Sequence, residues 1–496
     1  MTLRILGVLA ALIAIVGVPF VLKPKANLLA AADDTVVIIT PHNEAIRYEF
    51  AHAFSNYYQA KTGRSVRIDW RLVGGTSEIA RYLESEFYSA DERNGGPTGG
   101  IGIDLFFGGG AFDFIQQAAA GRLVPSGVIK AHPDWFNEDT IPAEVSGEPF
   151  YAPNGAWIGN CLSSFGICAN LDSLERLGFH ELLSGWPDLT DPRFFKEVAL
   201  ADPTKSGSAA KAFEMVIQQQ MQERVSAEKP HDQDGLHPAV ASGWDAGLQL
   251  ILKASANARY FTDAAPKVPM DVSLGDAAIG MCIDFFGRYQ SEAVTIDDEP
   301  TRMIYFTPVG GSSVGVDPIG LLRGAPHPEV AEAFIAFVLS LEGQKLWNFK
   351  VGTPGGPVRY ALRRLPIRKE LYDAKYAEDR SDPDVQPYEE AKFFTYHPEW
   401  TGKLFSPLRF IIRVMCLDAH NEQASAWKAL IEADFPPEAM AKFTDVSAVN
   451  YERALNVIRP TLKDPDRLQE VILAKQLGDH FRIQYREAER LAKEGK

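Results

Sequence analysis

Cysteine and positive charge are scarce in this sequence of 496 residues. Its four cysteines show neither CxxC nor Cys/His zinc spacing, so the sequence predicts no metal site and no cofactor. Lysine and arginine total 50 against 65 aspartates and glutamates, a net charge of −15, which argues against a nucleic-acid-binding protein. GxSxG, HExxH, P-loop, EF-hand and GxGxxG motifs are also missing. Catalytic residues need not be local in sequence, but nothing in these motifs favours an enzyme, and we expect none.

The overall composition is that of a folded globular protein. Hydrophobic residues make up 46% of the chain and charged residues 23%, which excludes a disordered or collagen-like chain. At roughly 100–200 residues per domain, the length predicts two to four lobes, each with its own core.

The N-terminus predicts export. Ile5 to Leu22 is a run of 18 uncharged, mostly apolar residues with a basic residue on each side, and three alanines at 30–32 offer a cleavage site. The run is also long enough to span a bilayer. We therefore interpret residues 1–32 as a signal peptide or an N-terminal membrane anchor. The protein is then periplasmic or extracytoplasmic, with anchoring to the inner membrane left open. In such a compartment Cys161 and Cys168 could form a disulfide, which the sequence does not decide.

Strands and helices alternate along the chain. Thr35–Thr40, Val66–Leu72 and Ile103–Phe107 read as strands, with helical apolar spacing between them. Further short strands are expected at Val198–Ala201, Ile279–Ile283, Met303–Phe306 and Ile319–Leu322. This order predicts right-handed βαβ units, an α/β fold and mostly parallel sheets.

Small and hydroxyl-bearing residues follow several of these strands, where a helix is expected to start. In open α/β sheets ligands bind beyond the carboxyl ends of the strands, and free N–H groups at helix starts suit anionic groups. The alternative is that Thr76, Ser77, Ser206 and Ser208 only cap helices. The candidate ligand-binding residues from this pattern are Thr40, His42, Asn43, Gly75, Thr76, Ser77, Gly109, Gly110, Ser206, Gly207 and Ser208.

Three separated segments carry a resemblance to a known family. They are WPDLTDPRFFKEVALADPTKSGS, VSLGDAAIGMCIDFFGRYQ and HPEVAEAFIAFVLSLEGQKLW, in this order. The chain resembles the type II periplasmic solute-binding proteins of ABC importers, in particular the group of ferric-ion and sugar-phosphate binders, over roughly residues 35–370. The resemblance implies two α/β lobes that close on a ligand by a hinge motion.

The same resemblance implies the domain boundaries. The first lobe would comprise residues 33–148 and a return segment at 312–370, and the second lobe residues 149–311. The chain would cross between the lobes near Pro149–Asn154 and near Thr307–Ser313. Residues 371–496 form a C-terminal extension outside the resemblance.

The resemblance also bears on the ligand. In ferric-ion binders a tyrosine pair follows the GDAAIG-like strand, whereas the matching positions here are Phe285 and Phe286. Phenyl rings offer no oxygen to Fe³⁺, so the resemblance favours an organic anion over iron. In that case Asp284 would accept hydrogen bonds from the ligand and Phe285 would pack against its carbon face. Alternatively, Asp284 is a helix N-cap.

The extension is charged and is expected to be helical. Apolar residues follow a helical stripe near its end: Leu468, Val471, Ile472, Leu477, Phe481, Tyr485, Ala488 and Leu491. This final helix either packs back on the lobes or docks a partner.

These observations predict an exported protein that captures a small anionic organic solute and delivers it to an ABC permease. The solute would be a sugar phosphate, a phosphonate or a carboxylate. The expected partners are the solute and the permease, with no nucleic acid. The alternatives are a ferric-iron-binding transport protein, or a ligand sensor or enzyme on the same fold.

Overall fold

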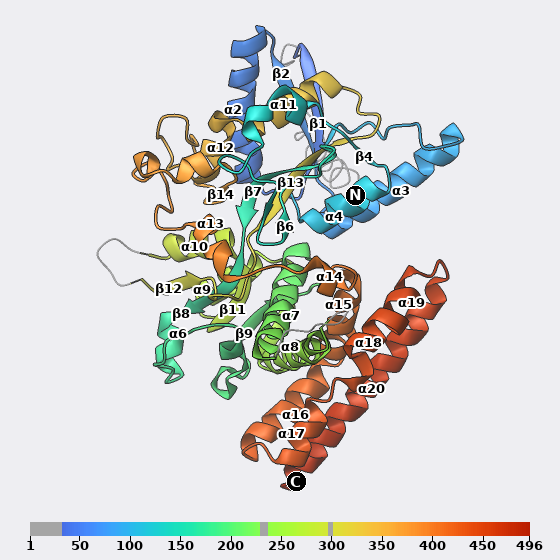
Figure 1. The fold of residues 1–496 in the computed structure, drawn as a ribbon. Helices are drawn as coiled ribbons and strands as arrows, with labels where there is room; N and C mark the ends of the chain where they lie inside the picture. Colours follow the sequence, from blue (N-terminus) through green and yellow to red (C-terminus); the bar gives the residue numbers. More distant parts are fainter. Residues whose placement is uncertain (1–31, 229–236, 296–300) are drawn as a thin grey trace, which may run out of the picture.

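The computed structural model of the protein describes residues 32–228, 237–295 and 301–496. Two sheets with helices on their faces lie one above the other in Figure 1, and a bundle of helices from the C-terminal region lies beside the lower one. The predicted signal peptide or anchor lies outside the described residues, except for its last residue. Within those ranges we find no helix with the length and hydropathy needed to cross a membrane.

The upper sheet, sheet 1, has the order β14-β7-β13-β3-β1-β2, and β4 pairs with β13. Its strands are β1 (Asp34–Ile39), β2 (Val66–Arg71), β3 (Leu105–Phe107), β4 (Leu123–Val124), β7 (Ile158–Ser163), β13 (Gly315–Leu322) and β14 (Leu365–Pro366). Its helices are α2 (Glu44–Thr62), α3 (Thr76–Asn94), α4 (Ala111–Ala119), α5 (Val128–Ala131), α11 (Pro328–Leu339) and α12 (Leu341–Asn348).

The N-terminal βαβ unit matches the sequence prediction closely. The β-branched run of β1 is buried and pairs in parallel with β2 and β3. Asn43 caps α2, which ends at Gly63, a residue in the left-handed conformation with φ 71°. Glycine adopts this conformation without a Cβ clash, and the helix therefore ends where the sequence predicts.

The lower sheet, sheet 2, has the order β10-β9-β11-β8-β12. Its strands are β8 (Phe165–Asn170), β9 (Val198–Ala201), β10 (Ala258–Thr262), β11 (Ile279–Ile283) and β12 (Met303–Phe306). Its helices are α6 (Leu171–Arg176), α7 (Gly207–Ala227), α8 (Ala239–Ala256), α9 (Lys267–Leu274) and α10 (Asp284–Ala293). A small separate pair, β5 (Glu144–Val145) and β6 (Glu148–Pro149), precedes the first crossing.

The strands that cross between the sheets differ from expectation. β7 pairs with β13 in sheet 1, so the chain enters sheet 2 only after Ser163, beyond the predicted crossing at 149–154. The second crossing lies between β12 and β13, as expected. Pairs that involve β7, β8 and β13 are antiparallel, so the sheets are mixed and not mostly parallel. The segment IGNCLSSFGICAN has neither alternation nor a β-branched run, which explains why β7 and β8 escaped prediction.

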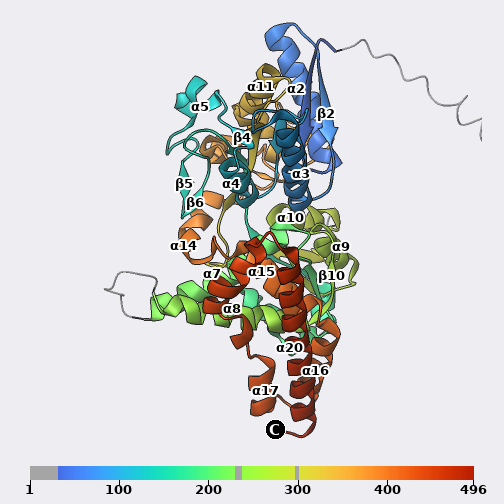
Figure 2. The ribbon, with the colours of Figure 1, turned by 90° about the vertical axis from the view of Figure 1, so that its right-hand side faces the viewer.

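The C-terminal region is helical, as predicted. Its helices are α13 (Pro387–Glu390), α14 (Pro398–Thr401), α15 (Phe405–Ile412), α16 (His420–Glu432), α17 (Pro437–Phe443), α18 (Tyr451–Arg453), α19 (Arg459–Lys463) and α20 (Arg467–Lys493), with π-helical turns at Arg413–Leu417 and Ala454–Ile458. Figure 2 shows α15, α16 and α20 packed beside α7 and α8 of the lower half.

From Phe394 on, the extension shares a hydrophobic core with sheet 2, whereas Ala391 belongs to the core of sheet 1. The Trp244 indole N–H of α8 donates to the Val449 carbonyl at 3.0 Å, and the Trp427 indole N–H donates to the Asn257 side chain at 2.7 Å. Buried polar bonds of this kind fix two elements in one arrangement. The extension from Phe394 on is thus a structural part of the lower half.

The stripe on α20 divides into two parts. Leu477, Phe481, Tyr485 and Ala488 are buried against the bundle, whereas Leu468, Val471 and Ile472 in the first turns are exposed. Of the two alternatives for this helix, packing back on the lobes therefore holds for its later turns.

All four cysteines are free and buried. Cys161 lies on β7 of sheet 1 and Cys168 on β8 of sheet 2, so the disulfide that the sequence left open is not present.

Candidate functional site

Three helix starts from the two halves meet at the boundary between them. A Cβ built on Gly109, whose φ is 119°, would lie 2.5 Å from Cγ2 of Thr76, so the starts of α3 and α4 are in contact. A Cβ on Gly75 would lie 3.4 Å from the Lys205 carbonyl, and one on Gly207 would lie 3.9 Å from Cβ of Thr76. The start of α7 thus adjoins that of α3. We call this place the helix-start junction.

The helix-start junction offers N–H groups and positive electrostatic potential. The first turn of a helix leaves amides without intrahelical acceptors, and the helix dipole places partial positive charge at the same end. Thr76 and Ser77 open α3, Ala111 opens α4 after Gly110, and Gly207 and Ser208 open α7. An anionic group is the ligand that such a junction can hold.

Some of the predicted residues serve as helix caps. The Asn43 side chain accepts from the N–H of Ile46 at 3.1 Å, and the Ser206 hydroxyl accepts from the N–H of Ala209 at 3.2 Å. For Ser206 this is the alternative that we left open, capping alone; for Asn43 the cap was not predicted. Ser208 has no such bond in the described part of the chain.

Thr40 and His42 lie below the surface of the upper half. The Thr40 hydroxyl accepts from the backbone N–H of His42 at 3.0 Å, and the His42 ring packs 4.7 Å from that of Phe107. A Cβ on Gly108 would lie 2.3 Å from Nε2 of His42, which is buried without a hydrogen-bond partner. Burial, with the charges of Arg364 and Arg47, holds the pKa of His42 well below its usual range. The neutral ring therefore packs against Gly108, next to the helix-start junction.

A buried ion pair continues from the junction to the crossing strands. Arg364 contacts the carboxylate of Asp317 on β13 at 2.6 Å. Arg364 also donates to the Ser163 hydroxyl at 2.7 Å, at the end of β7. Its side chain is 1% exposed, and Nε has no acceptor. One guanidinium therefore holds both crossing strands.

Asp284 and Phe285 lie at the other end of this chain of contacts. Phe285 packs 4.3 Å from the Arg364 guanidinium. Asp284 is fully buried at the first position of α10, where Ile283 is the N-cap, and it pairs with Arg288 at 2.8 Å. One of its oxygens has no partner. Asp284 is thus an ion-pair residue and not the N-cap that the alternative proposed.

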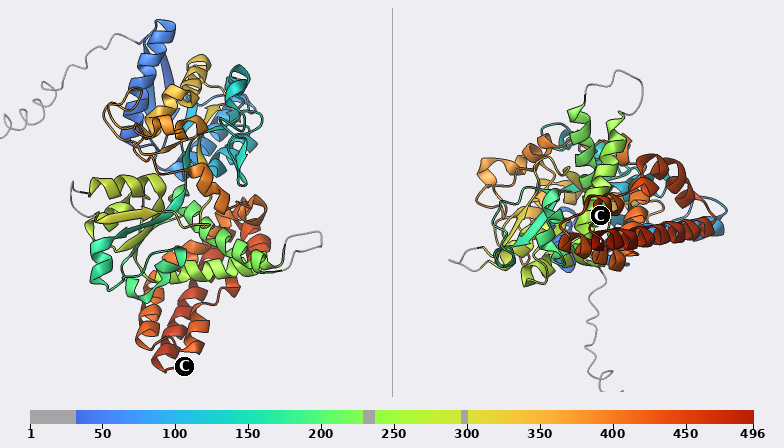
Figure 3. Two further views of the ribbon diagram at one scale, coloured as in Figure 1. Left: turned by 60° about the vertical axis from the view of Figure 1, so that its left-hand side comes forward. Right: turned by 90° about the horizontal axis from the view of Figure 1, so that it is seen from below.

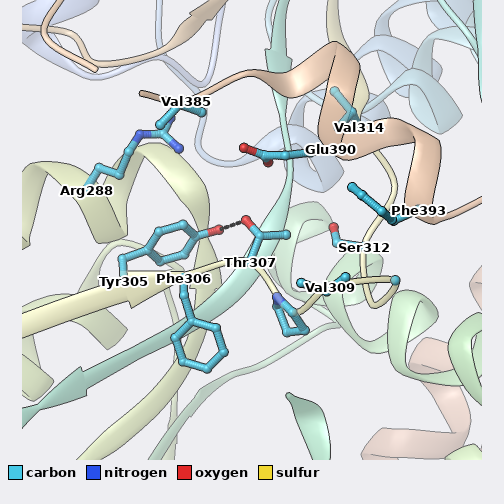
Figure 4. Close-up of a pocket in the computed structure, with 12 residues that line it drawn as sticks. Arg288, Tyr305, Phe306, Thr307, Val309, Ser312, Val314, Val385, Glu390 and Phe393 are labelled. Atoms are coloured by element: carbon cyan, nitrogen blue, oxygen red, sulfur yellow. Dashed lines mark hydrogen bonds between the residues drawn. The ribbon is translucent and has the colours of Figure 1, made fainter. Parts of the chain in front are cut away.

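A cavity of about 330 Å³ opens on the far side of Arg288 (Figure 4). The hydroxyls of Tyr305 and Thr307 lie 3.1 Å apart on its wall, and Glu390 faces them from the extension. The remaining wall is largely apolar, with residues such as Val385 and Phe393. Arg288 lines this cavity and pairs with Asp284. The cavity therefore adjoins the candidate site.

Sequence reasoning missed the charged residues that complete the site. Arg364 and Asp317 lie in segments without a local motif, and Asp113 stands in the first turn of α4. Burial raises the pKa of Asp113, and the nearby charge of Arg409 opposes this rise. Arg409 comes from α15 in the extension, where the resemblance gave no information.

The described residues contain no group of three or more His, Cys, Asp or Glu side chains placed to hold a metal ion. Phe285 and Phe286, which the resemblance matches to the tyrosine pair of ferric-ion binders, pack against one another with ring centroids 4.1 Å apart. Their phenyl rings offer no oxygen donor to Fe³⁺.

Part of the chain matches the model of a known family. Residues 172–349 match the family model of bacterial extracellular solute-binding proteins. A Haemophilus influenzae protein, itself uncharacterized, is 27% identical over 271 residues, which is 55% of this chain and 67% of that protein.

Two solved structures illustrate the fold. The periplasmic binding protein AfuA from Actinobacillus pleuropneumoniae, with fructose 6-phosphate bound, is 18% identical, with a TM-score of 0.52, and the match covers 73% of this chain and 94% of that one. Iron-bound HitA from Pseudomonas aeruginosa is also 18% identical, with a TM-score of 0.50 and coverage of 76% and 98%. The fold is therefore that of the periplasmic binding proteins.

Proposed function

We propose that this chain, a bacterial extracellular solute-binding protein of ABC transport, captures a small anionic organic solute between its two lobes and delivers it to an ABC permease. The family binds solutes without chemical turnover. The solute class is a sugar phosphate, a phosphonate or a carboxylate.

One observation carries this proposal: the starts of α3, α4 and α7 meet where the halves face one another. Three helix dipoles that point at one place give a positive potential that one anionic group would neutralise, and first-turn amides supply its hydrogen bonds.

The donor set favours an organic anion over ferric iron. The two structural relatives were solved with fructose 6-phosphate and with iron, so the fold by itself does not choose between these ligands. The choice comes from this chain's own residues, since phenylalanines occupy the tyrosine positions. The aromatic face of Phe285 and the hydroxyls of Thr76 and Ser208 suit the carbon and hydroxyl parts of an organic solute.

The lobes of this proposal follow the sheets and not the boundaries expected from the sequence. We assign residues up to about 163, together with the return segment from about 314, to lobe 1. Lobe 2 then begins at β8 and includes the extension from about residue 394 on, because the two share a core. Figure 3 shows the two halves joined through the crossing segments. Hinge motion at these crossings would open and close the junction.

A thermal-shift screen of the full chain tests the proposal. The panel is glucose 6-phosphate, fructose 6-phosphate, 2-aminoethylphosphonate, citrate, spermidine and ferric citrate. We expect at least one of the first four to stabilise the protein, by about 2.7 kcal/mol at 100 times its Kd. Stabilisation by spermidine or ferric citrate alone would refute the anionic solute.

A further inference from the structure

The extension reaches across the boundary between the lobes at the helix-start junction. Arg409 of α15 donates through Nη2 to the hydroxyl of Ser77 at 2.6 Å. The ring of Phe405, from the start of the same helix, packs 4.6 Å from that of Phe112 on α4. Leu408 and Ile411 of α15 are buried in the core of lobe 2. One short helix that belongs to lobe 2 therefore contacts the starts of α3 and α4 in lobe 1.

Arg409 brings positive charge to a place that is already positive. Its guanidinium lies 3.8 Å from the position that a Cβ on Gly207 would take, beside the start of α7. Arg409 has no carboxylate within 4.0 Å among residues 32–228, 237–295 and 301–496, and its Nε is buried without an acceptor. Asp113 attracts it from a greater distance, and Arg81 repels it. Burial of a cation without an ion-pair partner is costly, so an anion at this point would be stabilised by Arg409 and by the helix starts together.

We propose that Arg409 of the C-terminal extension binds the anionic group of the solute and bridges the two lobes in the closed state. This inference rests on the proposed function and adds a residue from outside the resemblance. The extension is then part of the binding site. A guanidinium suits the task because its planar donors can hold Ser77 through Nη2 and an oxyanion through Nε.

The first test is affinity. Arg409→Ala, Arg409→Lys and the wild type would be titrated with glucose 6-phosphate, fructose 6-phosphate, 2-aminoethylphosphonate and citrate. We expect the alanine variant to bind about ten- to 150-fold more weakly, the range for a hydrogen bond to a charged group. Lysine keeps the charge but lacks the planar donors of a guanidinium, so Arg409→Lys should recover part of the loss. Equal affinity of the wild type and Arg409→Ala would overturn the anion contact.

Arg413→Ala is the matched control. Arg413 lies one turn beyond Arg409 on the same helical segment and pairs with Asp418 of the extension at 3.8 Å. It should leave the affinity unchanged. A loss equal to that of Arg409→Ala would mean that any damage to this helix weakens binding, and would overturn the specific role of Arg409.

The second test is the distance between the lobes without ligand. The native cysteines are buried, so spin labels can be directed to cysteines introduced at Tyr88 and Leu182, which are exposed on lobes 1 and 2. Arg409→Ala should lengthen or broaden the distance distribution, and Arg413→Ala should not. An unchanged distribution in Arg409→Ala would overturn the bridge. If no anion binds the wild type, the proposed function fails. The distance measurement then still tests whether Arg409 bridges the lobes.

Discussion

Arg364 and Asp317 form an ion pair at 2.6 Å where the chain crosses between the lobes. The arginine follows α12 and the aspartate lies on β13, so the pair joins the segment after α12 to a crossing strand. The same arginine donates to the Ser163 hydroxyl at the end of β7, the other crossing strand, at 2.7 Å.

Removing one member of this pair should destabilise the protein strongly. Arg364→Ala leaves Asp317 without its cation, and we expect a loss of about 3 kcal/mol in the free energy of unfolding. The double variant Arg364→Met/Asp317→Asn should lose less than the sum of the two single changes, because no buried charge is left unpaired. Urea unfolding measures both. Additive losses would show that the two side chains do not act as a pair.

The sequence predicted well wherever local signals were strong. The β-branched run of β1 and the glycine at 63 define an element pair from neighbouring residues alone. The crossing strands β7 and β8 were missed because every residue in them is buried, so the segment does not alternate between buried and exposed positions. Tertiary contacts decide such strands.

The candidate site shows the same division. Helix starts such as Thr76 and Gly207 could be found from glycines and hydroxyls that follow strands. Arg364 and Arg409 could not, because each reaches the site from a distant segment with no motif around it. Whether the residues that were found bind the solute stays a prediction.

The two serines at the start of α7 should have separable effects. Ser206→Ala removes the cap on Ala209, so the ligand-free protein should lose about 1 kcal/mol of stability. Ser208→Ala removes no such bond and should change stability by less than about 0.5 kcal/mol.

The double variant Ser206→Ala/Ser208→Ala should bind the solute about five- to 150-fold more weakly, as measured by calorimetric titration. A sharp fall in the ligand-free melting temperature with unchanged affinity would assign both serines to structure alone. The second-lobe part of the site would then move toward Asp284.

Acid should destabilise the protein through His42. Its pKa is lowered in the folded state, so the neutral ring contributes stability above the usual value near 6.5, and this contribution is lost as the pH falls. At pH 5.5 the loss should approach about 1.4 kcal/mol. We expect His42→Gln to show a smaller drop than the wild type between pH 7.5 and 5.5 in urea unfolding. The exposed His52, changed to Gln, is the control; an identical drop in all three proteins would contradict the account.

Ferric iron should bind weakly or not at all. Phe285 and Phe286 supply no phenolate, so adding ferric citrate should produce no charge-transfer band in the visible spectrum. Tyr305 is the tyrosine that lines the adjoining cavity. A band that appears in the wild type and disappears in Tyr305→Phe would show that iron uses a different tyrosine.

The most direct test of the central claim is a calorimetric titration of variants in which a side chain introduced at Gly207 blocks the helix-start junction. A Cβ at this position meets its neighbours at 3.8–3.9 Å, ordinary contact distances, so Gly207→Ala should bind the anionic solute like the wild type. The larger side chain of Gly207→Leu would fill the space between Thr76, Asp113 and Arg409. We predict saturable heat with an anionic solute for the wild type and Gly207→Ala, and none for Gly207→Leu. Equal binding by Gly207→Leu, or no binding of any anion by the wild type, would contradict the account.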